Sequence, residues 1–196
     1  MPRVDPQGRL HFKIVFWGPS LSGKTTSLRW IYNNVEGITK GRFVSIEDPT
    51  GRTLYFDYTP VSISSKVVFD LYTVAGQRRH KIQRRKVLEG VDGILFVADS
   101  DPAQLQENEI SMTELRQLLG DKLGREIPLV VLLNKRDLPN AVSKETLLNA
   151  LKIVPVNIRV YEGIAIRGIG VKQAFKAIVR EVLWNYYQRA KQQKAQ

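Results

Sequence analysis

Short apolar runs alternate with segments of helical periodicity along most of the chain. The runs at 12–17, 93–98 and 127–133 are almost continuously apolar, which is typical of parallel strands buried on both faces of a sheet. Apolar residues recur at helical spacing within 25–35, namely Leu28, Ile31, Tyr32 and Val35. Repeated strand–helix units of this kind predict an α/β fold, with a mostly parallel sheet and helices on both of its faces.

The pattern predicts six strands and five helices in a single domain. We expect strands at 12–17, 53–58, 66–73, 93–100, 127–134 and 157–165. Helices are expected at 25–35, 78–89, 104–119, 143–151 and 170–190, with Ser143 as the N-cap of the fourth. A Pro/Ser segment between the second and third strands suits a hairpin, which makes one strand antiparallel. Residues 36–52 are expected to form a loop.

This pattern divides the chain into an N-terminal extension (1–11), one small domain (12–190) and a basic C-terminal tail (191–196). The start of the sequence lacks the apolar segment of a signal peptide, and no apolar run approaches the length of a transmembrane helix. Among the 196 residues there is no cysteine, which excludes disulfides, zinc thiolates and thiol nucleophiles. We therefore expect a cytoplasmic protein.

The charge of the chain narrows the range of partners only partly. The formal net charge is +11, and such a field favours nucleotides, nucleic acid, anionic lipid or an acidic protein. A nucleic-acid ligand is not expected, because no recognition module or aromatic platform accompanies the basic residues. Contact with a membrane is expected to be weak and peripheral at most. The densest basic run, at 77–86, predicts a solvated helical face, with a docking surface for an acidic partner as the alternative.

A glycine-rich segment between the first predicted strand and helix matches a phosphate-binding pattern. Residues 18–25, GPSLSGKT, fit G-x-x-x-x-G-K-[ST]. Backbone N–H groups of such a loop, and of the helix that follows, attract phosphate oxygens. Lys24 is expected to reach the β and γ phosphates, and the Thr25 hydroxyl to bind Mg²⁺. The predicted nucleotide contacts here are Gly18, Ser20, Leu21, Ser22, Gly23, Lys24, Thr25 and Thr26.

A second motif, NKRD at 134–137, follows the most apolar predicted strand. The Asp137 carboxylate can accept hydrogen bonds from the N1–H and the exocyclic amine of guanine, a pattern that adenine does not offer. Lys135 can lay its aliphatic stem over the base, and Asn134 can tie this loop to the phosphate loop. Both motifs follow strands of a parallel sheet, where ligands bind beyond the carboxyl ends. The sequence therefore predicts a guanine nucleotide and disfavours an ATP-using enzyme.

With these two motifs in place, the chain resembles the small GTPases of the Ras superfamily over nearly its whole length. It is most similar to the MglA-type bacterial and archaeal GTPases, which are relatives of the Arf group. The resemblance rests on five segments in a fixed order: GPSLSGKTT, RTLYFDY, LYTVAGQ, GVDGILFVADS and NKRDLP. It implies a single P-loop domain that hydrolyses GTP to GDP and phosphate, slowly without a partner.

The same resemblance implies roles for residues outside the two motifs. Gln77 would orient the attacking water, and the backbone N–H of Gly76 would contact the γ-phosphate. Thr53 would close over Mg²⁺ and the γ-phosphate, so that Thr25 and Thr53 are the expected metal ligands. Arg52 matches an arginine finger supplied in cis, a device that raises phosphoryl-transfer rates by about 10³–10⁵. Ala165 would offer its backbone N–H to the base.

One position departs from the pattern of most relatives. Thr73 stands where they carry an aspartate that contacts Mg²⁺ through water, although MglA-type proteins share the threonine. A hydroxyl hydrogen-bonds a metal-bound water more weakly than a carboxylate does. Asp57, on the neighbouring predicted strand, is a candidate to compensate in part in one switch state. The side chain of Ser20 would crowd a finger supplied from outside, which favours one supplied in cis.

We therefore expect a GTPase switch that binds GTP or GDP with Mg²⁺ and recruits effector proteins in its GTP form. By resemblance, its regulator is a Roadblock/LC7-type (MglB-like) dimer, and its process is cell polarity, motility or a related spatial task. The alternative is a nucleotide-binding interaction module with negligible hydrolysis. Lys24, Thr25, Thr53 and Gln77 argue against that alternative, and Thr73 keeps it open.

Overall fold

The computed structural model describes residues 2–47, 53–75 and 81–194 of the chain. Within them lies one sheet with the strand order β3-β5-β6-β2-β7-β8-β9, while β1 pairs with β2 and β4 pairs with β5. Its strands are β1 (Arg3–Val4), β2 (Leu10–Trp17), β3 (Thr39–Lys40), β4 (Val44–Glu47), β5 (Thr53–Ser64), β6 (Val67–Thr73), β7 (Gly93–Asp99), β8 (Leu129–Asn134) and β9 (Arg159–Glu162). The main helices are α1 (Lys24–Asn34), α2 (Lys81–Leu88), α3 (Leu105–Leu119), α4 (Lys144–Ala150) and α5 (Val171–Lys194).

The sheet is the one that the apolar pattern predicts, with three short strands added. Strands β6, β2, β7, β8 and β9 run parallel, and β5 is antiparallel to β6. Every residue of β7 and β8 is buried, which explains why these segments are apolar without alternation. The predicted six strands with one antiparallel member are therefore confirmed, and β1, β3 and β4 extend the sheet.

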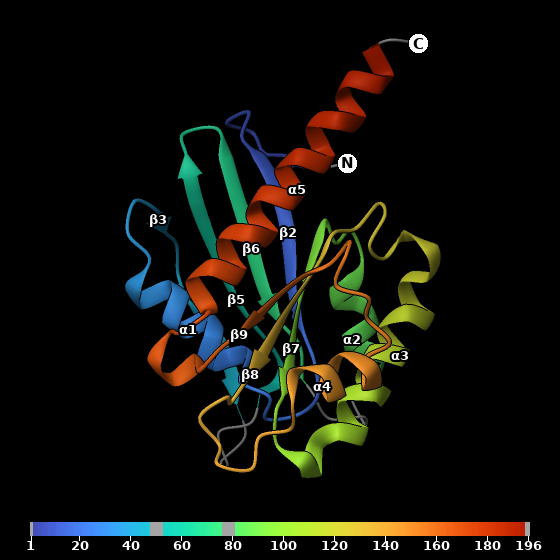
Figure 1. Ribbon diagram of the computed structural model, residues 1–196. Coiled ribbons are helices and arrows are strands. Elements are labelled where there is room, and N and C mark those ends of the chain that lie inside the picture. The colour runs from blue at the N-terminus through green and yellow to red at the C-terminus, as the bar shows by residue number, and fades with distance from the viewer. Residues whose placement is uncertain (1, 48–52, 76–80, 195–196) are drawn as a thin grey trace.

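Helices cover both faces of the sheet (Figure 1). One apolar layer packs α1 and α5 against the side chains of Phe12, Ile14 and Phe16. The other packs α2, α3 and α4 against Val15 and Trp17, which point the opposite way from β2. Because successive strand residues face opposite sides, one strand supplies both layers. This arrangement holds β2 rigidly in the centre, directly before the glycine-rich loop.

Two predicted boundaries were wrong. The segment 36–52 was expected to be a loop, but Thr39–Lys40 and Val44–Glu47 are strands paired with β5. The hairpin turn was expected between 58 and 66, but β5 continues to Ser64. Pro60 is accommodated inside that strand, where its carbonyl accepts a hydrogen bond of 2.8 Å from the Gly41 N–H. Proline lacks a donor but keeps its acceptor, so an acceptor-only position suits it.

The ends of the domain also extend further than the pattern shows. Strand β2 begins at Leu10, and α5 continues to Lys194, through most of the segment expected to be a tail. The last turns of α5 project beyond the end of the sheet (Figure 1). Among the described residues, none of the helices is both long and apolar enough to cross a membrane.

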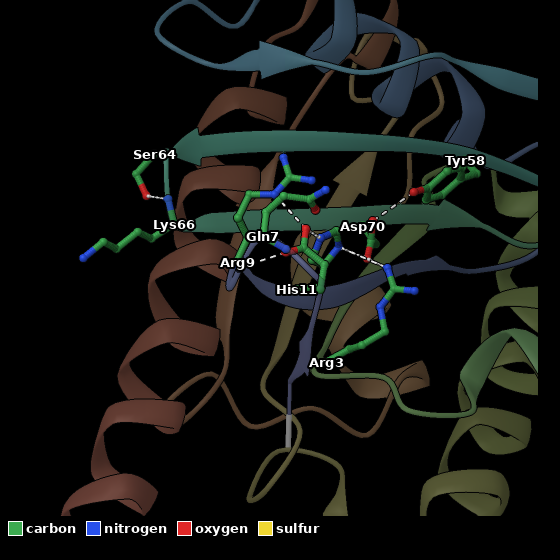
Figure 2. Close-up of polar contacts among 9 residues, drawn as sticks. Arg3, Gln7, Arg9, His11, Tyr58, Ser64, Lys66 and Asp70 are labelled. Atoms are coloured by element: carbon green, nitrogen blue, oxygen red, sulfur yellow. Dashed lines mark hydrogen bonds and ion pairs between the residues drawn. The ribbon is translucent and has the colours of Figure 1, made fainter.

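The N-terminal hairpin is fastened to the sheet by a cluster of polar side chains (Figure 2). Asp5 accepts hydrogen bonds from the backbone N–H of Arg9 at 2.9 Å and from its Nε at 2.7 Å. The ring of His11 lies between two carboxylates, 3.1 Å from Asp5 and 2.8 Å from Asp70. Asp70 in turn accepts a hydrogen bond from the Tyr58 hydroxyl at 2.9 Å. The cluster thus joins β1, β2, β6 and β5.

The cluster predicts an acid-sensitive contribution to stability. Partial burial acts to raise the pKa of Asp5, but hydrogen bonds from Arg9 and His11 outweigh it and hold that pKa well below its usual range. A carboxyl with a depressed folded-state pKa stabilises the fold above its unfolded pKa, near about 4, and loses this effect as the pH falls. Asp5→Asn should lower the melting temperature at pH 7, and the difference should shrink below about pH 4. Part of it should remain at pH 3, because the folded-state pKa of Asp5 lies lower still.

Thermal melting of both proteins between pH 7 and pH 3 checks this prediction. Asp121→Asn, a change at an exposed aspartate, serves as the matched control and should leave the melting temperature nearly unchanged throughout. An equal loss of stability at both ends of the pH range for Asp5→Asn would contradict the assignment.

Candidate functional site

The glycine-rich loop lies between the end of β2 and the start of α1, at the carboxyl edge of the parallel strands. Gly18 has φ +148°, and a Cβ there would lie 2.2 Å from the Val97 carbonyl oxygen. Gly23 has φ +100°, and its Cβ would lie 2.2 Å from Nδ2 of Asn134. Side chains are thus excluded at both positions by backbone conformation and by space. Leu21 adopts φ 61° between them, a left-handed conformation that is uncommon for a bulky residue.

The start of α1 is arranged to receive an anion. Gly23 is its N-cap and provides no side-chain hydrogen bond, and no acidic residue lies in the first turn. The helix therefore offers backbone N–H groups and the positive end of its dipole. The hydroxyl oxygen of Ser22 is buried without a hydrogen-bond partner in the described part of the chain. Such an unsatisfied group beside the N-terminal turn of a helix fits a ligand rich in oxygen.

Lys24 is buried beneath this loop. Its Nζ donates to the carbonyl oxygens of Gly18 at 3.2 Å and Pro19 at 2.5 Å. Burial, together with the nearby positive charge of Arg84, lowers the pKa of Lys24 to about 7, although the negative charge of Asp57 acts in the opposite direction. An amine held only by neutral carbonyls in such a place gains strongly from a phosphate oxygen.

Three hydroxyl groups converge on the carboxylate of Asp57, which is fully buried on β5. Its Oδ2 accepts hydrogen bonds of 2.6 Å from Oγ1 of Thr25 and 2.6 Å from Oγ1 of Thr73. Its Oδ1 accepts one of 2.5 Å from Oγ of Ser45. The Asp57 N–H also donates to Oγ1 of Thr73 at 3.0 Å. The cluster gathers α1, β4, β5 and β6 at the edge of the phosphate loop.

This cluster fits a magnesium ion. Mg²⁺ prefers hard oxygen ligands, and it is usually held by one or two carboxylates or hydroxyls together with phosphates and water. Asp57 provides one carboxylate, and Thr25 and Thr73 provide two hydroxyls that both hydrogen-bond to it. The described residues contain no group of three His, Cys, Asp or Glu side chains that would form an all-protein cage. A site completed by phosphate oxygens is what these residues suit.

The NKRD segment forms a second loop at the same edge of the sheet. Asn134 ends β8, and its Nδ2 donates to the Ser22 carbonyl at 2.7 Å. Its Oδ1 accepts from the Ala165 N–H at 2.8 Å. The predicted link between the two loops is therefore present, and it reaches a third loop as well. The Ala165 N–H, which the sequence assigned to the base, is bonded to Asn134 in this structure.

Lys135 and Asp137 complete this loop in different ways. Lys135 has φ 64°, and its Nζ lies 2.6 Å from Oδ2 of the buried Asp99. Asp137 is exposed, and its carboxylate has no hydrogen-bond partner in the ranges that the structure describes. An unengaged carboxylate beside a fixed lysine stem has the chemistry that guanine requires.

The comparisons with known proteins agree with this geometry. A model of the ADP-ribosylation factor family matches residues 5–182. The chain belongs to this family. It is 42% identical over 180 residues to the mutual gliding-motility protein MglA of Myxococcus xanthus, covering 89% of this chain and 91% of that protein.

A solved structure of the Arl6 (BBS3) small GTPase from Trypanosoma brucei, bound to the nucleotide analogue GppNp, shares the fold. Its TM-score is 0.68 at 18% identity, with 89% of this chain and 99% of that chain covered. The predicted MglA-type small GTPase is confirmed, and with it the binding and hydrolysis of GTP.

The structure brings together only part of the predicted site of this GTPase. Gly18, Ser20, Leu21, Ser22, Gly23 and Lys24 form the phosphate loop, and Thr25 and Thr26 lie in the first turn of α1. Arg52, Gly76 and Gln77 lie outside the described residues. Thr53 begins β5, and the structure does not describe its side chain. Their roles stay predictions.

Three residues of this GTPase were not given their observed roles by sequence reasoning. Asp99 was assigned no role, yet its carboxylate lies 2.6 Å from Nζ of Lys135. Arg136 fixes the NKRD loop: its Nε donates to Oε2 of Glu162 at 2.9 Å, and its Nη1 donates to the Val142 carbonyl at 2.6 Å. Arg84 was expected on a solvated face, but only 3% of it is exposed. Their charged partners are distant in sequence, so no local motif marks them.

Because the Asn134 side chain links two loops, we expect its removal to lower the affinity for nucleotide. Asn134→Ala leaves the Ser22 carbonyl and the Ala165 N–H buried without their partner, at about 1–3 kcal/mol for each group. The Kd for GDP and for a non-hydrolysable GTP analogue should both rise, by about tenfold to a hundredfold, since each 1.4 kcal/mol is tenfold.

Competition binding with a fluorescent guanine nucleotide checks this prediction. Asn149→Ala, at an exposed position of α4, is the matched control and should bind as the unchanged protein does. A selective effect on the GTP analogue would show that Asn134 does not act through the loops common to both nucleotides.

Proposed function

We propose that this GTPase is a Mg²⁺-dependent switch whose GTP form recruits effector proteins. The observation that supports it best is the convergence of Thr25 and Thr73 on Asp57, because it joins the phosphate loop to the strands that carry both predicted switch segments. These segments, 36–58 and 73–86, contain Asp57 and Thr73 respectively. A nucleotide that changes the contacts of Thr25 therefore changes the restraint on both segments.

The residues of the cluster would hold the metal in this proposal. Thr25 would ligate Mg²⁺ directly, as would Thr53 in the GTP form. Asp57 and Thr73 would hydrogen-bond to the hydroxyl groups and water molecules around the ion. When bound, Mg²⁺ supplies charge neutralisation to the β and γ phosphates. Lys24 would exchange the carbonyls of Gly18 and Pro19 for phosphate oxygens. Asp57 would thereby provide the carboxylate that Thr73 lacks.

Hydrolysis would depend on the positioning of a water molecule and of positive charge. Gln77 would orient the attacking water, and the Gly76 N–H would contact the γ-phosphate. Arg52 would act as a finger supplied by the chain itself. Guanine would be held by Asp137 and Lys135, with Asn134 and Ala165 supporting the loop.

The biological setting follows from the most informative relative. That protein is named for mutual gliding motility, and we propose that the present chain acts in motility, polarity or a related spatial process. Its regulator would be a Roadblock/LC7-type (MglB-like) dimer that stimulates hydrolysis. We propose the cytoplasm as its compartment, in keeping with a chain that contains no cysteine.

Turnover of GTP by purified protein tests the proposed function. Phosphate release should be slow, should require Mg²⁺, and should rise when a Roadblock-type dimer is added. Arg52→Ala should lower the single-turnover rate by about 10³ or more, within the range of arginine-finger effects, with nucleotide affinity nearly intact. An unchanged rate would exclude Arg52 as the finger. Tight binding without phosphate release under any condition would favour the interaction module instead.

The proposed metal site predicts a magnesium-dependent defect on changing Asp57. Asp57→Asn keeps the shape of the side chain but removes its charge, so the Mg²⁺ concentration for half-maximal nucleotide retention should rise about 10–100-fold. Release of fluorescent GDP, measured against free Mg²⁺, checks this. Asp70→Asn, at a buried aspartate of β6 that is not part of the Asp57 cluster, is the control. Equal defects with and without chelator would mean that Asp57 supports the fold rather than the metal.

A further inference from the structure

Arg84 differs from every other basic residue described on α2. Only 3% of its surface is exposed, whereas Arg85 and Lys86, next to it in sequence, are exposed. Burying a guanidinium is costly unless charged and hydrogen-bonding partners compensate for the lost water. Its burial therefore indicates a specific set of contacts rather than a solvated helix face.

The contacts of Arg84 join three elements beside the nucleotide site. Its Nη2 lies 2.8 Å from Oε2 of Glu114 on α3. Its guanidinium stacks over the ring of Trp17, with 4.4 Å between the guanidinium carbon and the ring centroid. Trp17 is itself fixed by a hydrogen bond of 3.0 Å from Nε1 to the Ser111 carbonyl of α3. Arg84 therefore ties α2 to α3 and to the last residue of β2.

The position of this link relates it to the phosphate loop. Trp17 directly precedes Gly18, and the charge of Arg84 contributes to lowering the pKa of Lys24, so the two cations lie close enough to repel each other. Two buried cations near the phosphate loop suit a ligand that carries several negative charges. In the sequence, Arg84 lies seven residues after Gln77, within the first helical turn of α2.

We propose that Arg84 is a positioning residue for GTP hydrolysis: it fixes the start of α2 against Trp17 and Glu114, and α2 follows Gln77 closely in the sequence. The inference rests on the proposed role of Gln77. It requires no contact between Arg84 and the nucleotide. Its effect should therefore fall on the rate of phosphate release more than on ground-state affinity.

The experiment measures single-turnover hydrolysis of GTP in Mg²⁺ alongside the Kd for fluorescent GDP. Arg84→Met, which keeps most of the volume and removes the charge, should lower the rate at least tenfold and change the Kd by less than threefold. Arg84→Lys should recover part of the rate, because an ammonium can still lie over Trp17 and pair with Glu114. Arg85→Met, the exposed neighbour, is the matched control and should hydrolyse GTP at the unchanged rate.

Two further variants keep the inference testable if Arg84→Met does not fold. Glu114→Gln removes only the ion-pair partner and should lower the rate in the same direction, again with little change in Kd. Gln77→Leu separates this inference from the proposed function: an unchanged rate there overturns the role of Gln77 itself. A slow Gln77→Leu beside an unchanged Arg84→Met or Glu114→Gln overturns only the positioning role. Equal loss of GDP binding and of rate would also overturn it, since that pattern marks a purely structural residue.

Discussion

The burial of the Asp57 carboxylate is the constraint on which the arrangement of this site depends. A carboxylate that is fully removed from water must be hydrogen-bonded, and here Thr25, Thr73 and Ser45 provide the donors. These residues come from α1, β6 and β4. Satisfying one charge thus fixes the first turn after the phosphate loop against β4 and β6, two of the strands that pair with β5. Any ligand that draws Thr25 away must offer Asp57 a replacement, and Mg²⁺ or its waters can do so.

This constraint also accounts for the threonine that replaces the common aspartate. Tyr58 pairs with Tyr72 across the β5–β6 ladder, so Asp57 and Thr73 face each other one position further along. An aspartate at 73 would place a second carboxylate beside the buried Asp57, and two such charges repel strongly in a dry environment. A hydroxyl there can instead donate to Asp57. We propose that Asp57, on the neighbouring strand, supplies the negative charge that position 73 lacks.

The sequence was sufficient for those parts of the fold that depend on local pattern. Continuous apolar runs identified the central strands, and Ser143 caps α4 as predicted, with its Oγ accepting from the Thr146 N–H at 3.0 Å. Strands β3 and β4 were missed because they are short edge segments, paired through the backbone with little side-chain signal. The burial of Arg84 could not be predicted either, since Trp17 and Glu114 lie far from it in sequence. The phosphate and guanine motifs, by contrast, could be recognised from the sequence, because the residues of each motif are contiguous in one loop.

The cations at this edge of the sheet differ in whether their partners are charged or neutral, and this difference fits the roles proposed for them. Lys135 lies in an ion pair with Asp99, and Arg84 in one with Glu114, so both cations have an anionic partner. Within the part of the chain that the structure describes, Lys24 donates its hydrogen bonds to the neutral carbonyls of Gly18 and Pro19. Bonds to neutral acceptors are roughly half as strong as bonds to anions. Lys24 is therefore the cation that can transfer to a phosphate at the least cost, while Lys135 and Arg84 keep the walls of the site in place around it.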